Sequence, residues 1–166
     1  MLTIYRKNDT LLNIIKSPNW KYFDSEENIY NNLAKDTLTP DLITLYETEK
    51  GTCFWIFDAK YYNIKLDKKK VKGQPGIGDV TKQYLYQLAY NDFILKHEIK
   101  NVKNAFLIPT EEENALLNGE VEMEILKGLS NPPLSNILVV KLPANNIYKY
   151  YLSNRKIDIH KEYSFL

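Results

Sequence analysis

Two aspartates and one lysine have the types and the spacing that metal-dependent cleavage of a phosphodiester requires. Pro40-Asp41 opens one apolar, strand-like run, and a second such run ends in Asp58-Ala59-Lys60. Asp58 and Lys60 stand at alternate positions, so in a strand both side chains point to one face. Carboxylates can hold Mg²⁺, which generates a hydroxide and neutralises charge on the phosphate. A lysine can orient that water for in-line attack or stabilise the developing negative charge.

The same residues could instead form an ordinary Asp–Lys pair on the surface at a strand end. The apolar run 54–57 argues against this, because it places two charged groups at the edge of a core. A charge buried there is unfavourable unless it is paired or metal-bound. We therefore predict that Asp41 and Asp58 bind one or two metal ions, with the Ala59 carbonyl as an additional candidate ligand. Hard oxygen ligands favour Mg²⁺, with Mn²⁺ as a substitute, over zinc.

A polar stripe follows on a predicted long helix that begins with Asp79 as its cap and reaches about Glu98. Asp79, Gln83 and Gln87 follow one another at four-residue intervals, and Tyr90 follows three residues after Gln87. These side chains share one stripe of a helix. We predict that Gln87 supports the catalytic site and that Gln83 and Tyr90 contact DNA. The alternative is a set of solvated polar residues beside the apolar face, which is formed by Val80, Tyr84, Leu88 and Leu95.

A cluster of lysines lies between the predicted catalytic strand and this helix. The segment 63–78 is expected to be a mobile basic loop, and Lys68, Lys69, Lys70 and Lys72 are predicted to contact DNA phosphates. A lysine ammonium binds phosphates without reading bases. The alternative is a solvated loop with no partner.

The remaining pattern predicts a mixed α/β domain in which helices cover both faces of a central sheet. We expect a single domain over 1–166, in which 1–36 is a helical N-terminal part. Expected helices cover 10–15, 26–33 with Ser25 as a cap, and 143–151, which Pro143 opens. Expected strands cover 38–46, 53–62, 102–108 and 137–142, and 20–23 is either a brief strand or irregular.

Composition limits the function classes. The single cysteine, Cys53, excludes an internal disulfide and a cysteine-based zinc site. No stretch approaches the roughly 20 apolar residues of a membrane span, and the N-terminus lacks a signal-peptide core. We therefore predict a cytoplasmic protein without membrane contact. Twenty-two basic and twenty-one acidic residues leave a net charge of +1. That is little for a self-sufficient DNA binder, so another domain or subunit is expected to hold most of the DNA.

The motif residues resemble a known superfamily of nucleases. Pro40-Asp41 with Asp58-Ala59-Lys60 resembles the PD-(D/E)xK motif in its D-x-K form. The segments 58–62, 73–76 and 78–90 are similar to those of LlaJI-type restriction endonucleases, with the strongest likeness over 40–90. Gln87 with Tyr90 also resembles the Q-x-x-Y helix element of RecB-like nucleases.

This resemblance implies a restriction-endonuclease-like fold, Mg²⁺-dependent cleavage of double-stranded DNA and a role in defence against foreign DNA. It maps Asp41, Asp58 and Lys60 onto the catalytic set. Many such enzymes carry a further acidic residue on an earlier helix, which Glu26 or Glu27 could supply. A separate DNA-recognition domain or partner subunit is implied, and a homodimer would serve double-strand cleavage.

Two other interpretations remain open at this stage. The chain could be the nuclease subunit of a GTP-dependent modified-DNA restriction or repair system. It could also be a non-catalytic DNA-binding module on the same fold, although the complete Asp–Asp–Lys set argues against that.

Overall fold

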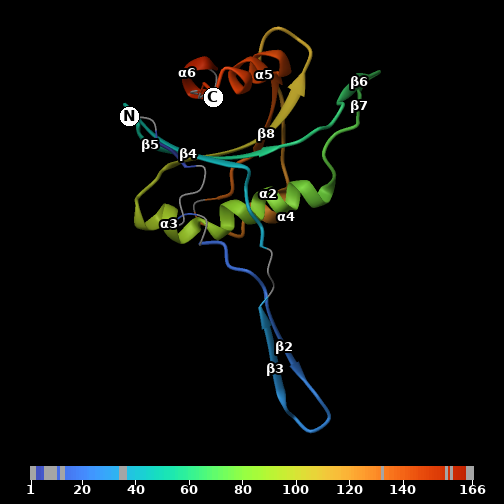
Figure 1. Cartoon of the computed structure of the whole chain (residues 1–166), viewed down its shortest axis with the longest axis vertical. Coiled ribbons are helices and arrows are strands. Elements are labelled where there is room, and N and C mark those ends of the chain that lie inside the picture. The colour runs from blue at the N-terminus through green and yellow to red at the C-terminus, as the bar shows by residue number, and fades with distance from the viewer. Residues whose placement is uncertain are drawn as a thin grey trace.

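A mixed sheet forms the centre of the computed structural model, which describes residues 3–5, 11, 14–33, 37–131, 133–155, 157 and 159–163 (Figure 1). In the described part this sheet has six strands in the order β1-β4-β5-β8-β10-β9. Their bounds are Thr3–Tyr5 for β1, Leu42–Thr48 for β4, Gly51–Ala59 for β5, Asn101–Thr110 for β8, Leu116–Val121 for β9 and Ile137–Pro143 for β10.

The three inner strands β5, β8 and β10 run parallel, and the outer strands are antiparallel to their neighbours. Parallel neighbours need a long crossover, usually helical. Between β5 and β8 that crossover contains α2 (Ile77–Ala89) and α3 (Asn91–Lys96). Residues 53–57 of β5 are buried without interruption, as expected for a strand that is covered on both faces. The predicted mixed α/β architecture is confirmed.

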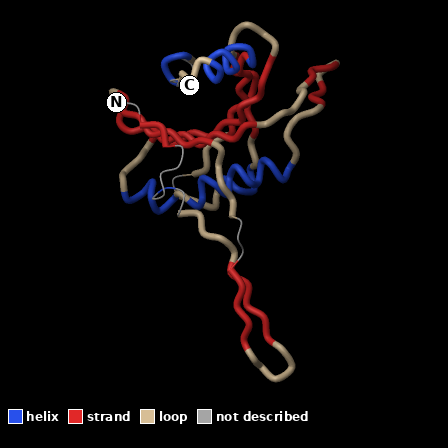
Figure 2. The backbone as a smooth tube through the Cα atoms, in the orientation of Figure 1, coloured by secondary structure: helices blue, strands red, loops and turns tan. Residues whose placement is uncertain are grey.

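Helices cover both faces of the sheet (Figure 2). Helices α2 and α3 lie on one face together with α4 (Glu124–Lys127), and α5 (Ala144–Leu152) and α6 (Ile159–Glu162) lie on the other. Phe54 and Ile56 pack in one core cluster with α2, whereas Trp55 and Phe57 pack in another with α6. This alternation follows from the two-residue period of a strand. Asp58 continues the Phe54–Ile56 series and therefore faces α2.

The crossover helix is shorter than predicted. Helix α2 starts after Gly76 as N-cap, so Asp79 lies in the first turn instead of capping the helix. The helix ends at Tyr90, where φ is −89° and ψ is 0°, values outside the α-helical range. The buried side chains before the break include Val80, as predicted. Beyond it Ile94 is buried and Leu95 is 52% exposed, so the predicted apolar face does not extend to Leu95.

The predicted helix over 26–33 is wrong. Residues 19–33 form a hairpin in which β2 (Asn19–Phe23) pairs with β3 (Ile29–Leu33). Its turn is organised by Asp24, whose side chain accepts hydrogen bonds from the backbone N–H groups of Glu26 and Asn28, both at 2.9 Å. Such side-chain-to-backbone bonds compete with helix formation. The strand at 20–23 is confirmed, but the description of 1–36 as helical fails for this hairpin. In the helix predicted over 10–15, residues 10, 12 and 13 lie outside the described residues; Leu11 is helical, but Ile14 and Ile15 lie in a turn and a bend.

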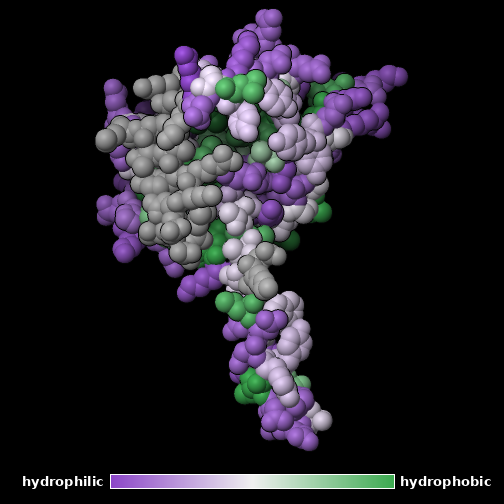
Figure 3. Space-filling view, viewed as in Figure 1, coloured by the Kyte–Doolittle hydropathy of each residue, from purple (hydrophilic) through white to green (hydrophobic). Residues whose placement is uncertain are grey.

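The hairpin 19–33, called the arm below, projects from the body of the molecule (Figures 1 and 3). Its strand residues are exposed on both faces. The described core clusters draw no side chain from it. An isolated two-stranded hairpin is only marginally stable in water. The large exposed apolar side chains of the arm are Trp20, Tyr22, Phe23, Ile29, Tyr30 and Leu33.

The lysine-rich segment also differs from its prediction as a mobile loop. It contains a second hairpin, the ribbon, in which β6 (Lys65–Asp67) pairs with β7 (Lys70–Lys72). Lys68 and Lys69 form its turn with positive φ values of 44° and 68°, the backbone that a two-residue hairpin turn needs. At Gly73 φ is +68°, and a Cβ atom would lie 2.4 Å from the Asn63 carbonyl oxygen. Glycine is therefore required at the base of the ribbon.

Strands predicted over 38–46, 53–62, 102–108 and 137–142 are confirmed as β4, β5, β8 and β10, with shifted ends. The predicted final helix is confirmed as α5, where Pro143 is the N-cap instead of a first-turn residue. Strands β1 and β9 and helices α4 and α6 were not predicted. In the described part of the chain no helix is long and apolar enough to span a membrane.

Deletion of the arm tests its independence from the core. We expect replacement of residues 19–33 by a short Gly-Ser linker to change the thermal unfolding midpoint by less than about 3 °C, the effect of roughly 1 kcal/mol in a protein of this size. Calorimetry measures the midpoint. Ile56→Ala, at a fully buried core position, is the positive control and should cost about 2–5 kcal/mol. An arm deletion as damaging as Ile56→Ala would show that the arm packs on the core.

Candidate active site

The two predicted aspartates meet at one edge of the sheet. The β4–β5 register pairs Leu42 with Phe57, so Asp41, which precedes β4, lies beside Asp58 near the end of β5. The backbone N–H of Ala59 donates a hydrogen bond of 2.8 Å to Asp41 Oδ2. Asp41 is thereby tied to the strand that carries Asp58. The structure brings these carboxylates together as the sequence predicted.

Asp58 is the buried member of the pair, with an exposed fraction of 3%. Burial raises the pKa of this carboxyl, and the nearby charge of Asp41 raises it further. Hydrogen bonding and charge from Lys60, together with the charge of Lys82, act in the opposite direction without cancelling the rise. Two carboxylates are therefore held close together at a partly desolvated strand end, where an added cation would be favourable.

Lys60 lies between two carboxylates. Its Nζ forms an ion pair with Asp58 and a second one, at 3.1 Å, with Asp79 Oδ1. Its backbone N–H donates to the Leu107 carbonyl at 2.9 Å, which continues the pairing of β5 with β8 past the strand end. Burial by itself would lower the pKa of the Lys60 ammonium, but the two carboxylates outweigh burial and hold it above its ordinary value. Lys60 is therefore a fixed positive charge.

Two residues outside the predicted catalytic set, Asp79 and Tyr62, contact this lysine or its partner. Asp79 Oδ1 forms an ion pair with Lys60, and Asp79 Oδ2 accepts a 2.7 Å hydrogen bond from the hydroxyl of Tyr62. Burial raises the pKa of Asp79, but the bonds from Tyr62 and Lys60 outweigh that effect and lower it overall. A usable signal was present: Asp79 begins the four-residue spacing that continues through Gln83 and Gln87, in a first helical turn that favours a carboxylate.

The glutamines of α2 lie beneath the sheet instead of over the carboxylates. Gln83 is fully buried, and its Nε2 donates to the Ile56 carbonyl at 3.0 Å. Tyr90 is also fully buried and packs against Phe54 with ring centroids 5.4 Å apart. The predicted contacts of Gln83 and Tyr90 with DNA are contradicted by this burial. The stripe faces the sheet, because both the polar and the aromatic residues pack under the strands.

Gln87 takes part in a buried polar network. Its Oε1 accepts hydrogen bonds from Asn104 Nδ2 at 2.6 Å and from the backbone N–H and hydroxyl of Ser135 at 3.2 and 3.1 Å. Buried polar groups of this kind need such partners. Gln87 therefore braces β8 and the segment leading into β10, and its hydrogen bonds within the described residues go to these elements and not to Asp41 or Asp58. A supporting role in the site stays a prediction.

Glu26 and Glu27 do not join the site. Both lie in the turn of the arm, far from the sheet edge (Figure 1). The predicted upstream acid depended on a helix that the Asp24-centred turn replaces.

A groove of about 570 Å³ is lined in part by the residues that follow Lys60 in the chain. One side comes from the chain that follows Lys60, and the other from the carboxyl ends of β8 and β10, where ligands commonly bind in α/β sheets. Tyr61, 89% exposed, also borders a smaller hollow of about 190 Å³ that reaches Ala59. The groove is lined by Tyr61, Tyr62, Asn63, Ile64, Ile108, Pro109, Thr110, Glu111, Glu112 and Lys141.

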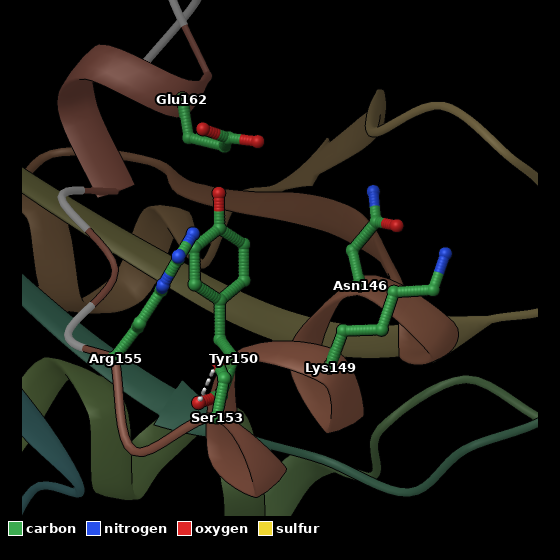
Figure 4. Close-up of a pocket in the computed structure, with 6 residues that line it drawn as sticks. All are labelled: Asn146, Lys149, Tyr150, Ser153, Arg155 and Glu162. Atoms are coloured by element: carbon green, nitrogen blue, oxygen red, sulfur yellow. Dashed lines mark hydrogen bonds between the residues drawn. The ribbon is translucent and has the colours of Figure 1, made fainter.

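A different hollow, of about 240 Å³, lies on the other side of the sheet at α5 and α6 (Figure 4). There the Tyr150 hydroxyl points toward Glu162, and the Ser153 hydroxyl donates to the Tyr150 carbonyl at 3.1 Å. It contains one carboxylate and none of the residues predicted to do chemistry. The sheet edge is thus the stronger candidate for the active site.

The oxygen donors at the sheet edge suit a hard divalent cation. Within the described residues no three His, Cys, Asp or Glu side chains gather as a ready metal site. Asp41 and Asp58, with the Ala59 carbonyl, would therefore leave several positions to water or substrate. Mg²⁺ commonly binds in this way, through one or two carboxylates. The burial and mutual repulsion at Asp58 are consistent with such a cation.

Comparison with known proteins identifies the family of this chain. The family model described as LlaJI restriction endonuclease matches residues 3–145. A relative from Bacillus subtilis (strain 168), the type II restriction enzyme BsuMI component YdjA, is 32% identical over 166 residues. The alignment covers 99% of this chain but 33% of the relative, so the chain spans about a third of that protein's length. No solved structure matches. Because the family match includes the central sheet, α2 and every residue of the candidate site, this chain belongs to the LlaJI restriction endonuclease family.

Proposed function

We propose that this chain is a Mg²⁺-dependent endonuclease domain that hydrolyses phosphodiester bonds of double-stranded DNA as the cleavage part of a type II-like restriction enzyme. The observation that carries the proposal is the meeting of Asp41, Asp58 and Lys60 at one sheet edge, beside an open groove. Membership of a restriction endonuclease family supports it. The complete set favours catalysis over a purely DNA-binding role.

Asp41 and Asp58, with the Ala59 carbonyl, would hold Mg²⁺ or its substitute Mn²⁺. When bound, that ion supplies a hydroxide at neutral pH and neutralises charge on the scissile phosphate. Lys60 orients the attacking water and stabilises the negative charge that develops on the phosphate. The backbone bond between Lys60 and Leu107 limits how far this lysine can move.

Binding of the DNA is divided between this chain and something outside it. The ribbon carries Lys68, Lys69, Lys70 and Lys72 on an exposed hairpin between the catalytic strand and α2, where the lysines can contact phosphates. A net charge of +1 leaves most of the affinity to a separate recognition domain or partner subunit. The name of the Bacillus relative as an enzyme component supports such a partner. A homodimer would provide two active sites, one for each strand of the DNA.

Replacing Asp58 by Asn should abolish cleavage, because it removes a cation ligand while keeping the shape of the side chain. Nicking of supercoiled plasmid in Mg²⁺ measures activity, and calorimetric titration with Mn²⁺ measures cation binding. Glu49→Gln, in the exposed turn at the opposite end of the β4–β5 hairpin, is the matched control and should act like the parent. Cleavage by Asp58→Asn within tenfold of the parent would rule out this site.

Asp58→Asn also tests how the free energy of unfolding of the metal-free protein depends on pH. A raised pKa means that the native state binds more protons than the unfolded state just above pH 4. The contribution of Asp58 to the free energy of unfolding therefore decreases as the pH rises through its native pKa. Asp58→Asn removes that decrease, so at neutral pH the variant should be at least as stable as the parent in urea titrations. A clear loss of stability would mean that the pairing with Lys60 outweighs the burial.

Replacing Lys60 by Ala should slow cleavage by about 10²-fold or more, the scale of losing one electrostatic stabiliser. Cation binding should persist, because Lys60 is not a ligand. Single-turnover cleavage and calorimetry measure the two effects. Lys50→Ala, in the exposed β4–β5 turn, is the control. If Lys60→Ala lost cation affinity as completely as Asp58→Asn, the mechanism would be wrong.

Replacing the four ribbon lysines by Gln should weaken DNA binding equally for all sequences, because ammonium groups contact phosphates rather than bases. Each lost phosphate contact should flatten the log–log salt dependence by about 0.9. Filter binding with the inactive Asp58→Asn background at several salt concentrations gives affinity and slope.

The matched control removes the same charge from exposed lysines outside the ribbon. Three of them lie near the opposite edge of the sheet and one lies in α3: Lys50, Lys96, Lys100 and Lys103. Equal losses in both quadruple variants would mean that only net charge matters. A changed sequence preference in the ribbon variant would place part of the recognition surface on this chain.

A further inference from the structure

The Lys60 ammonium and the proposed divalent cation would compete for the same carboxylate, Asp58. Its ammonium pairs with Asp58 Oδ2, and Asp58 is also a proposed cation ligand. An ammonium and a divalent cation cannot both occupy the same carboxylate oxygen closely, since like charges repel. Binding of the cation therefore requires Lys60 to withdraw from Asp58 without leaving the site where it acts on the substrate.

Asp79 is placed to retain the lysine during that exchange. Its Oδ1 lies 3.1 Å from Lys60 Nζ, and Oδ2 accepts the hydroxyl of Tyr62 at 2.7 Å. Both carboxylate oxygens of Asp79 therefore contact residues of the segment that follows β5, Lys60 and Tyr62. In the first turn of α2 the carboxylate also lies at the positive end of the helix dipole.

The anchoring of Asp79 is independent of Asp41 and Asp58. Its backbone N–H donates to the Gly76 carbonyl at 3.1 Å, in a helix that packs under the sheet through buried Val80 and Tyr84. Asp58, by contrast, is carried by β5. Lys60 is therefore shared between a carboxylate on the helix and one on the strand, of which only the latter is a proposed cation ligand.

We propose that Asp79, oriented by Tyr62, is a positioning residue that holds Lys60 at the active site and draws its ammonium away from Asp58 when Asp58 takes a divalent cation. This inference rests on the proposed roles of Asp58 and Lys60. Asp79 acts through Lys60 and contacts neither the cation nor the DNA. Tyr62 contributes by fixing the second oxygen of Asp79, so that the first remains directed at the lysine.

The test compares cation binding by the full chain in the presence and absence of the lysine. Calorimetric titration with Mn²⁺, without DNA, is performed on Asp79→Asn, Lys60→Ala and the double variant. Asp79→Asn should bind Mn²⁺ about tenfold more weakly than the parent, because Lys60 then pairs with Asp58 alone. A tenfold change in affinity lies in the range of coupling energies found for residues in contact. In the Lys60→Ala background Asp79→Asn should have no further effect.

Two further variants separate positioning from a general structural defect. Tyr62→Phe should weaken Mn²⁺ binding in the same direction but less, by roughly threefold, since it releases one oxygen of Asp79. Asp67→Asn breaks an exposed Asp–Lys pair, 2.9 Å long, in the ribbon, and should leave Mn²⁺ affinity unchanged. Circular dichroism and thermal unfolding confirm that each variant is folded.

Kinetics supply a second readout. At saturating Mg²⁺, Asp79→Asn should lower kcat about tenfold while KM for DNA changes little, because Lys60 has lost its anchor but the DNA-binding surface is intact. Asp79→Glu keeps the charge and should restore part of kcat.

The outcomes distinguish the inference from the proposed function. Parent-like Mn²⁺ affinity and kcat in Asp79→Asn would overturn the positioning role and leave the nuclease proposal standing. The same affinity loss with and without Lys60 would also overturn it, because Asp79 would then bind the cation directly. Failure of the parent chain to bind Mn²⁺, together with full cleavage by Asp58→Asn, would overturn both.

Discussion

The burial of β5 on both faces is the constraint on which the rest of the site depends. Its run of apolar side chains is buried in two separate core clusters, one under α2 and one against α6. The strand then ends in Asp58, which remains almost fully buried. A carboxylate in that position needs a partner. Lys60, just past the end of the same strand, provides one, and the closeness of Asp41 makes additional positive charge favourable.

Helix α2 supplies hydrogen-bonding and charged partners to the neighbouring strands with different side chains along its length. Its first turn places Asp79 beside Lys60, and its middle satisfies the strand backbone through Gln83. Further on, Gln87 joins buried Asn104 to Ser135. These bonds tie α2 to β8 and to the segment before β10, whereas the buried Oε1 of Gln83 has no hydrogen-bond partner among the described residues. The amides thus support the strands that carry the carboxylates, while the candidate active site lies at the strand ends.

Two hairpins extend from this rigid body with opposite character. The ribbon is short and lysine-rich, and it emerges directly after the catalytic segment. The arm is longer, with aromatic side chains along its strands and acidic residues in its turn. The described structure shows neither hairpin adding a side chain to the core. Their exposure is compatible with the proposed partner of this chain, which spans about a third of the length of its Bacillus relative.

The sequence by itself was sufficient for the features that depend on local pattern. Apolar runs identified four strands of the sheet, and the alternation of Asp58 and Lys60 placed both on one face, because a strand has a strict period of two. Asp41 could be assigned to the same site as Asp58 and Lys60 because β4 and β5 are consecutive strands that form a hairpin. Resemblance to the LlaJI family was also readable from the motif segments, and the family match confirms it.

Only the tertiary structure decided which polar residues reach the sheet edge that carries Asp41, Asp58 and Lys60. The stripe on α2 was visible as a spacing, but the depth at which the helix packs determines that Gln83 and Tyr90 are buried and that Asp79 meets Lys60. The turn around Asp24 similarly replaced a predicted helix, since its side-chain hydrogen bonds within 24–30 compete with helix formation. Contacts between segments distant in the chain depend on how elements pack, and periodicity along a single segment carries no information about that packing.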